Sequence, residues 1–388
     1  MAHCECRPET WKNRLAYRLS NELIELTVLL GGGHIADLRL VGSKLNTLWE
    51  APWQTIDSRS FCAANDTAAR HATLYGDATV GKFLSGYTGH ALVLGYFGMP
   101  SPDEATRGLP LHGEAGNAEW TVMAAEENND VCSLTMEVEL PVHGLQFRRT
   151  IILAADAFAA AIDETVVNRK DAETAFQWVQ HTAFGEPFYT NADSSLFVPV
   201  SRCRTWPLGY EGHELLANDA EFTWPTAWSV SGEKVDLRIP FQKTGRGFVA
   251  SLLTQPDREQ AYIAVHNRRV NMVAGYSYNR SRFPWIALWE ENCARSYPPW
   301  NGNTKARGVE FGTSPMPLGL EEARKTKTIY DTPVLATIPP RSQLRTCYEI
   351  FVATVAPSWE GVSDVVSTGD SLFIRNGDAE VRLRTSRN

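Results

Sequence analysis

Apolar and polar residues alternate along most of this chain with the two-residue period of a β-strand. Segments 131–140 and 145–153 keep the pattern over their whole length, with His143 and Gly144 as a turn between them. The same alternation predicts two or three strands within 13–41 and further strands at 120–126, 162–168, 174–183, 247–254, 261–266, 270–276, 283–290, 306–313, 332–338, 342–356 and 370–383. Short strands with frequent turns are typical of a large antiparallel β-sandwich, so we predict an all-β fold.

A few segments depart from this rhythm. Segment 45–98 is irregular and rich in glycine, and we expect loops with short strands there that overhang a site. Segment 154–161 has helical propensity, but its neighbours favour a strand or turn extension; segment 319–326 is the one plausible short helix. No internal repeat or linker is visible, which predicts one domain over 1–388, with residues 1–12 as an N-terminal extension.

Glu310 is the first candidate for chemistry, because it stands inside an otherwise apolar strand segment. Its same-face neighbours in a strand are Gly308 and Gly312, which leave room for a flat ligand to approach the carboxylate. A buried Glu is costly unless it is paired or used. An ion pair with Arg307 is therefore the structural alternative to a catalytic role.

Two histidines are the next candidates. His112 lies in the segment LPLHGEAGNAEW, where Gly113 allows unusual backbone angles and close approach. His181 points to the opposite face of its strand from Phe176 and Trp178. His181 could instead be a core residue hydrogen-bonded to the backbone, which is the commoner role for a lone histidine.

One Glu and two His together suit general acid–base catalysis without a nucleophile. A carboxylate base and an imidazolium acid can act at neutral pH on two neighbouring oxygens, as the opening of a cyclic hemiacetal requires. The same groups could ligate zinc, but the HExxH spacing is absent, and so are the GxSxG, P-loop and Rossmann motifs. We therefore expect no metal and no cofactor.

Composition narrows the class of partner. The net charge of -8 and the pI of about 5.7 argue against nucleic acid and against an anionic membrane. No apolar run is long enough for a membrane span, and the N-terminus lacks a signal-peptide pattern, so we expect a cytoplasmic protein. Twelve Trp and twelve Tyr could provide platforms for sugar rings, although most are expected in the core.

Three motifs in order resemble the galactose mutarotase (aldose 1-epimerase-like) superfamily: LPLHGEAGNAEW, then QHTAFGEPF, then ARGVEFGTSP. The resemblance implies a β-supersandwich and cofactor-free interconversion of the anomers of a sugar or sugar derivative. It implies that Glu310 deprotonates the anomeric hydroxyl, that His181 protonates the ring oxygen and that His112 orients the sugar.

The chain also departs from the family pattern. Glu114 replaces the second Gly of the HGG motif, and Lys82 or Arg70 would have to fill the place of a sugar-binding Arg. The remaining candidates for sugar contact are Asn117, Trp285 and Arg307.

Two other functions stay open. One is a non-catalytic carbohydrate-binding protein, and the other is a lyase or hydrolase that uses a second acid from Glu290, Glu291 or Glu114. A small carbohydrate is the expected partner in each case, and both a monomer and a homodimer are compatible with the sequence.

Overall fold

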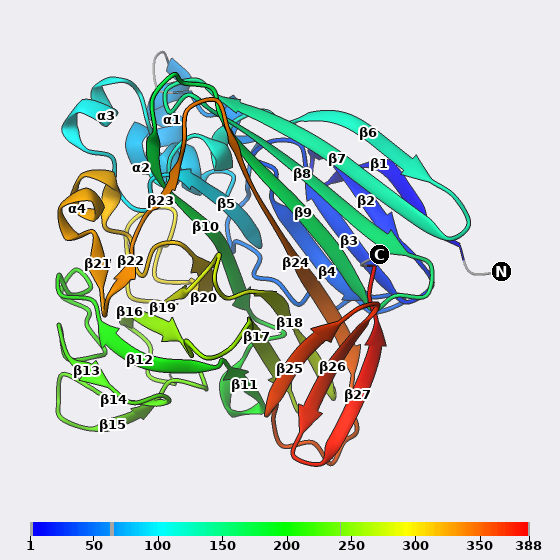
Figure 1. The fold of residues 1–388 in the computed structure, drawn as a ribbon. Coiled ribbons are helices and arrows are strands. Elements are labelled where there is room, and N and C mark those ends of the chain that lie inside the picture. Colours follow the sequence, from blue (N-terminus) through cyan, green and yellow to red (C-terminus); the bar gives the residue numbers. More distant parts are fainter. Residues whose placement is uncertain (1–2, 63–65, 241, 387–388) are drawn as a thin grey trace.

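Two large antiparallel sheets face each other in the computed structural model, which describes residues 3–62, 66–240 and 242–386 (Figure 1). The 12-stranded sheet has the order β1 (Glu5–Trp11), β2 (Arg14–Ser20), β3 (Ile24–Leu29), β4 (Ile35–Leu40), β5 (His90–Gly95), β10 (Thr174–Gly185), β20 (Lys305–Gly312), β19 (Trp285–Asn292), β16 (Arg246–Thr254), β12 (Val200–Thr205) and β13 (Glu221–Phe222), and β23 (Ala336–Ile338) also pairs with β10. The 8-stranded sheet has the order β11 (Ser194–Phe197), β17 (Gln260–Asn267), β18 (Met272–Asn279), β24 (Gln343–Thr354), β9 (Ala159–Asn168), β8 (Leu145–Ala154), β7 (Val131–Leu140) and β6 (Thr121–Glu127). The predicted all-β sandwich is confirmed.

Smaller elements surround the two sheets. Strands β25 (Asp364–Thr368), β26 (Ser371–Asn376) and β27 (Ala379–Arg384) form a third sheet, and the pairs β14 (Thr226–Trp228) with β15 (Lys234–Asp236) and β21 (Thr328–Ile329) with β22 (Thr332–Pro333) form hairpins. The helices are α1 (Asp66–Tyr75), α2 (Ala78–Leu84), α3 (Pro102–Thr106) and α4 (Gly319–Thr326), with 3₁₀ turns η1 (Ser58–Ser60), η2 (Ala115–Asn117) and η3 (Asn191–Asp193). None of the described helices is long and apolar enough to cross a membrane.

The main core fills the space between the two large sheets. On β10, Phe176 and Trp178 point into it, and the Trp178 ring meets Phe147 of β8 at a centroid distance of 6.1 Å. Phe311 of β20 stacks on Tyr278 of β18 at 4.3 Å. Because side chains alternate along a strand, the intervening residues of β10, β19 and β20 point to the other face of the 12-stranded sheet.

Segment 45–98 contains more helix than its sequence predicted. Apart from residues 63–65, which lie outside the described residues, it holds α1, α2 and the short strand β5. Asp77 caps α2 by accepting hydrogen bonds from the N–H groups of Thr79 and Val80. Gly81, one of the glycines of this segment, lies inside α2, where a Cβ would come within 2.5 Å of the Gly76 carbonyl oxygen. The short helix predicted at 319–326 is confirmed as α4, and 154–161 holds the end of β8, a turn and the start of β9, in agreement with the predicted strand or turn extension.

The N-terminal residues are part of the sheet. Residues 1–12 were predicted as an extension; the first two lie outside the described residues, and Glu5–Trp11 form β1, which pairs along its length with β2. Lys12 and Asn13, both with positive φ, make the tight turn between the two strands. The alternation in β1 is weak because an edge strand exposes much of its surface, and this is why the sequence did not reveal it.

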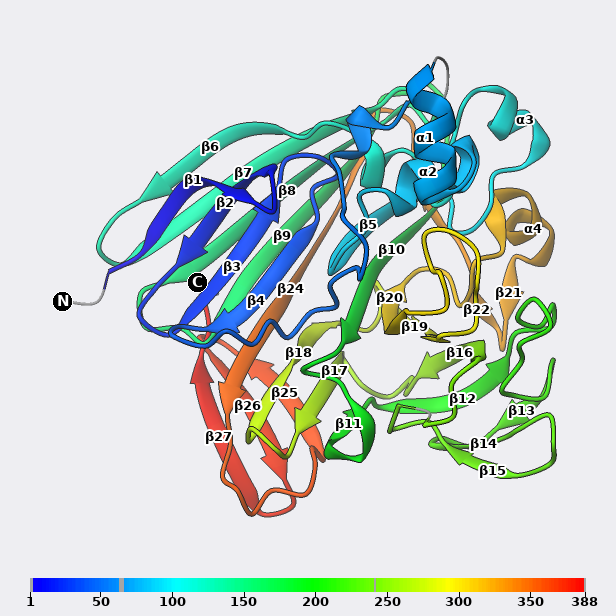
Figure 2. The ribbon, with the colours of Figure 1, turned by 180° about the vertical axis from the view of Figure 1, so that it is seen from behind.

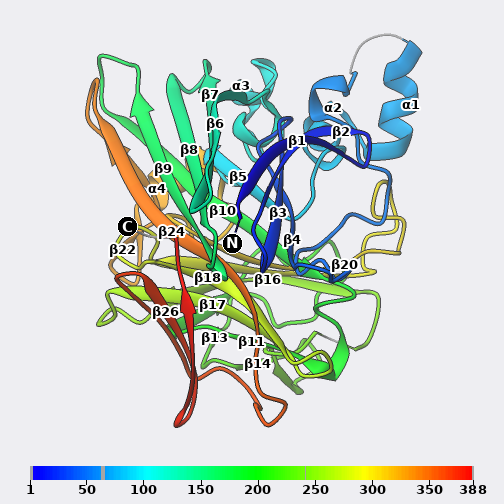
Figure 3. The same cartoon turned by 90° about the vertical axis from the view of Figure 1, so that its right-hand side faces the viewer.

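The helices and the third sheet lie at opposite ends of the sandwich. Figure 2 shows α1 and α2 at the top of the view, next to α3, and Figure 3 shows the third sheet at the far end from α1 and α2. The third sheet packs through Val365, Leu372 and Ile374 against β17, β18 and β24. The candidate site lies next to α2.

Candidate active site

A pocket of about 410 Å³ lies on the face of the 12-stranded sheet that points away from the second sheet. Its floor is formed by β10, β19 and β20, and its walls by α2 and by the loops that follow β5, β12 and β19. It is lined by Val80, Phe83, Leu84, Tyr87, Phe97, Gly98, Met99, Leu111, His112, His181, Trp206, Leu208, Gly209, Tyr210, Glu211, Val249, Ala287, Trp289, Arg295, Tyr297, Trp300, Glu310 and Pro317. A concave site with many aromatic side chains and few polar ones is typical of a small-molecule pocket.

Glu310 and His181 meet at the floor of this pocket. The register of β10 with β20 pairs Ala183 with Gly308, which sets His181 opposite Glu310 on the same face. His181 Nε2 lies 3.3 Å from Glu310 Oε1, and both side chains are buried. A Cβ on Gly308 would lie 2.4 Å from Glu310 Oε1. The space that the glycine leaves is thus filled by the Glu310 carboxyl itself, and not, as predicted, kept open for a ligand.

Burial controls the protonation of this pair. It raises the pKa of Glu310 well above its ordinary value, and it lowers the pKa of His181 to about 3. Desolvation therefore favours the neutral forms of both groups, a protonated carboxyl facing a neutral imidazole. The sequence predicted a carboxylate and an imidazolium, which hold the same number of protons. The two states differ only in which partner carries the shared proton.

Tyr87 holds the other side of the imidazole. Its hydroxyl lies 2.9 Å from His181 Nδ1, and burial raises its pKa well above the ordinary phenol value, so it remains a neutral phenol. In the neutral form of the pair, Glu310 donates to Nε2, so the hydrogen of the ring is on Nδ1 and is donated to the Tyr87 oxygen. The phenol oxygen would equally stabilise His181 if the ring took the second proton.

His112 is the third group of the cluster. Its Nδ1 accepts a hydrogen bond from the Gly98 N–H at 3.1 Å, which leaves the hydrogen of the neutral ring on Nε2 as a donor. Burial and the nearby His181 hold the pKa of His112 well below the ordinary value. The His112 ring centre lies 5.0 Å from that of His181, and its own backbone adopts φ 65°. The structure therefore brings together the three groups that the motifs singled out.

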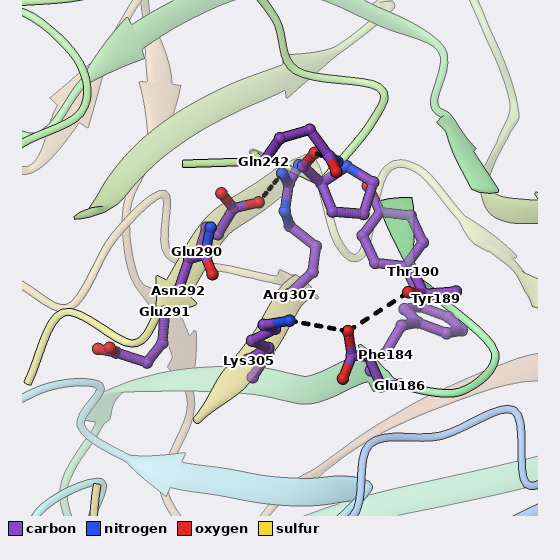
Figure 4. A pocket seen from close by; sticks show the side chains of 13 residues that line it. Phe184, Glu186, Tyr189, Thr190, Gln242, Glu290, Glu291, Asn292, Lys305 and Arg307 are labelled. Carbon is purple, nitrogen blue, oxygen red and sulfur yellow. Dashed lines mark hydrogen bonds and ion pairs between the residues drawn. The ribbon is translucent and has the colours of Figure 1, made fainter. Parts of the chain in front are cut away.

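Trp285 and Arg307, two further candidates for sugar contact, lie outside the pocket. Trp285 shares the face of Ala287, but its indole N–H donates to the Pro333 carbonyl at 2.8 Å, so β22 covers it. Arg307 is three residues from Glu310 and points to the opposite face of β20. There it forms a buried ion pair with Glu290 in a separate cavity of about 180 Å³ (Figure 4). Glu310 and Arg307 are thus not partners.

Asn117, Lys82 and Arg70 also lie away from the pocket lining. Asn117 Nδ2 donates to the Gly113 carbonyl at 3.0 Å, so it supports the turn after His112. Lys82 is half-buried on α2, whose pocket-facing residues are Val80, Phe83 and Leu84 instead. Arg70 is exposed on α1.

The sequence did not single out most of the pocket wall. Trp289, which was not a candidate, shares the face of Trp285 and lies in the pocket where Trp285 does not. Tyr87 lies in none of the three sequence motifs. Segments 206–211 and 293–300 looked like ordinary turns, although both are rich in aromatic residues. In the described part of the chain, no group of three or more His, Cys, Asp or Glu side chains is placed to hold a metal ion.

Solved structures with the same architecture extend over most of the chain. A Klebsiella pneumoniae subsp. pneumoniae protein provisionally classed as an aldose 1-epimerase is similar over 89% of this chain and 81% of its own, with TM-score 0.62 and 15% identity. A galactose mutarotase-like protein from Clostridium acetobutylicum is similar over 91% and 99%, with TM-score 0.60 and 12% identity. The Slr1438 protein from Synechocystis sp. PCC 6803 is similar over 90% and 98%, with TM-score 0.56 and 14% identity. The galactose mutarotase-like fold implied by the three motifs is therefore confirmed.

Comparisons of the sequence find fewer similar proteins than the comparison of structures. A search of curated proteins finds no match. A family model described as a domain of unknown function, DUF4432, matches residues 60–299. The match includes His112, His181 and Trp289, and Glu310 follows shortly after its end. Because it covers more than half of the 388 residues, the chain belongs to the DUF4432 family, and its fold is galactose mutarotase-like.

Proposed function

We propose that the protein is an aldose 1-epimerase-like isomerase, which interconverts the anomers of a sugar or sugar derivative by acid–base catalysis. One observation carries this proposal: His181 Nε2 and Glu310 Oε1 lie 3.3 Å apart at the floor of an aromatic pocket. A pair that can take a proton at one oxygen and give one at a neighbouring oxygen is what hemiacetal opening needs.

The proposed reaction moves two protons and breaks one bond. With the sugar bound, the shared proton passes from Glu310 to His181 Nε2. Glu310 then takes the proton of the anomeric hydroxyl while His181 protonates the ring oxygen, and the C1–O5 bond breaks to give the open-chain aldehyde. Rotation about C1–C2 and the reverse proton transfers close the ring on the other face. Tyr87 stabilises the imidazolium, and the Nε2–H of His112 is available to a sugar hydroxyl.

The glycoside hydrolase alternative has little support from the residues first considered for it. Glu290 pairs with Arg307, and Glu114 lies 2.7 Å from His143 Nδ1. Glu291 accepts hydrogen bonds from the Tyr210 hydroxyl and from the N–H groups of segment 294–295. These three carboxylates are engaged outside the floor of the pocket, so none is placed as a second acid beside Glu310.

Exchange NMR on a panel of free aldoses and uronic acids tests the proposal. We expect faster exchange between α and β anomers of at least one sugar, and a loss of about 10²–10⁴-fold in rate for Glu310→Gln. Glu221→Gln, an exposed change of the same kind on β13, is the matched control and should keep the wild-type rate. Equal rates for wild type and Glu310→Gln on every sugar would refute the proposal. Calorimetric binding that survives in both proteins without exchange would instead support a non-catalytic binding protein.

A further inference from the structure

The pocket extends well beyond the Glu310–His181 pair, and its outer part is built differently from its floor. Trp289 is the wall that both parts share. Its ring centre lies 6.3 Å from that of His181 on one side and 5.9 Å from that of Trp300 on the other. Beyond Trp300 the aromatic row continues to Trp53, at 5.4 Å. A ligand seated at the proton pair would therefore have continuous aromatic surface leading outward from it.

Two loops form the outer part, and polar contacts lock them together. Segment 206–211 follows β12, and segment 293–300 follows β19. Glu211 of the first loop accepts hydrogen bonds from Arg295 Nε at 2.9 Å and from the Tyr297 hydroxyl at 2.8 Å, both in the second. The Arg295 guanidinium also lies over the rings of Tyr210 and Trp300, at 4.4 and 5.2 Å. The outer part is thus an organised surface and not the accidental gap between two free loops.

The rim of the outer part leaves apolar surface uncovered. Leu208 is 79% exposed, Met99 53% and Tyr297 46%, and all three line this pocket. Large apolar side chains left exposed beside an aromatic pocket are typical of surfaces that a ligand covers. The floor cluster of Glu310, His181 and His112 offers hydrogen-bonding groups, whereas the outer part offers mainly ring faces with one charged edge.

The charged groups at this edge are paired with one another, and their arrangement favours an uncharged ligand. Arg295 is the cation of the outer part, and it is paired with two carboxylates, Glu211 and Glu291. One guanidinium between two carboxylates repels a phosphate or carboxylate group on the ligand more than it attracts it. Ring faces with a few polar atoms along one edge match a neutral pyranose, which is apolar on its C–H faces and polar at its rim.

We propose that this outer part is a second sugar subsite and that the substrate is a neutral reducing disaccharide. The reducing ring lies at Glu310 and His181, where its anomeric carbon must be for the reaction. The second ring, attached through a non-anomeric oxygen of the first, lies between Trp206, Tyr297 and Trp300. This inference rests on the proposed function for the orientation of the disaccharide, and on the two loops for the second ring.

The test compares sugars that differ only in the second ring. Glucose is compared with cellobiose and maltose, and xylose with xylobiose. Calorimetry on the Glu310→Gln protein measures affinity without turnover, and exchange NMR on the wild type measures turnover. We expect at least one disaccharide to bind about tenfold or more tightly than its matched monosaccharide. A disaccharide whose second ring is a uronic acid should lose this advantage.

Substitutions at the rim test whether the outer part of the pocket causes the preference for the disaccharide. Tyr297→Ala and Leu208→Ala change exposed side chains, so the fold should be kept, which circular dichroism checks. Each should reduce the preference for the disaccharide several-fold. Trp228→Ala, a similarly exposed aromatic on β14 and outside the pocket, is the control and should leave the preference intact.

The possible outcomes separate the two proposals. Equal affinity and turnover for both sugars of every pair, with measurable exchange, overturn the subsite and leave the isomerase. A disaccharide preference that is lost in Tyr297→Ala, without any exchange, supports the subsite and refutes the isomerase. Stronger binding of an aryl-substituted sugar than of any disaccharide overturns the subsite as a sugar site. Absence of binding by all of these sugars overturns the subsite and leaves the isomerase to the test on the wider panel of aldoses and uronic acids.

Discussion

Strand β20 places two ionisable groups on its two faces, and neighbouring β19 gives each a different partner. Arg307 faces Glu290 across the strands, whereas Glu310 faces Ala287. Glu290 and Glu310 are buried to a similar degree, at 3% and 2% exposure. One carboxylate thus forms a buried ion pair, and the other lies beside a histidine.

The comparison teaches that the residue across the strand, and not burial, decides what a buried carboxylate can do. Glu290 lies beside a guanidinium and forms an ion pair with it, and Figure 4 shows Arg307 reaching it within the small cavity. Arg307 also donates to the carbonyl groups of Leu237 and Ile239, so it ties β20 to the segment after β15. Glu310 has a methyl group opposite it instead, and desolvation alone raises its pKa. The first pair is suited to stability and the second to proton exchange.

Breaking the ion pair should have the largest effect on stability. Arg307→Met removes the cation beside Glu290 and two hydrogen bonds to backbone carbonyls, so we expect the free energy of unfolding to fall by about 3–5 kcal/mol. Urea denaturation followed by tryptophan fluorescence measures it. The double variant Arg307→Met/Glu290→Gln should recover part of the loss, because no charge is then left buried. Sugar turnover per folded molecule should persist; if it fell as far as in Glu310→Gln, the division between the two faces would be wrong.

Glu310→Gln should instead raise the free energy of unfolding at neutral pH. The folded state raises the pKa of Glu310, so the protein has the full benefit of the protonated form below the ordinary carboxyl pKa and loses it as pH rises through the folded pKa. The amide that replaces the carboxyl in this variant cannot ionise. We therefore expect the variant to be more stable than wild type by about 0.5–2 kcal/mol at pH 7–8, with little difference at pH 4.

Urea denaturation at the two pH values measures this difference. The same measurement on Arg307→Met should show a loss at both pH values. A wild-type protein that gained stability from Glu310 as pH rose would show that the carboxyl finds a cation in solution, and the contrast with Glu290 would fail.

Much of this arrangement could be predicted from single strands, and the rest could not. The two-residue period put His181 on the face opposite Trp178, and the structure agrees. The same rule already separates Arg307 from Glu310, since an odd spacing puts them on opposite faces. What no single strand reveals is register. That Ala287 and not Glu290 lies across from Glu310 depends on pairing between β19 and β20.

The walls of the pocket could not be predicted from single strands either. Trp285 and Trp289 have the same parity, and only the position of β22, which covers Trp285, distinguishes them. The outer loops are positioned by contacts between segments about 80 residues apart, such as that of Arg295 with Glu211. Local sequence patterns carry no information on such contacts, so the wall of the pocket was missed while its floor was found.

Removal of the Tyr87 hydroxyl should have the smallest effect and sharpens the comparison most. Tyr87→Phe keeps the ring, which packs on Phe83 at 5.0 Å, and removes only the partner of His181 Nδ1. One lost hydrogen bond of about 1–1.5 kcal/mol predicts a fall in kcat of about tenfold, with KM almost unchanged. Tyr276→Phe is the matched control, because its hydroxyl lies 3.4 Å from His90 Nδ1 on the core face of the same sheet. It should cost stability and leave kcat intact. If both substitutions lowered kcat equally, Tyr87 would act through the fold and not as a positioning residue for His181.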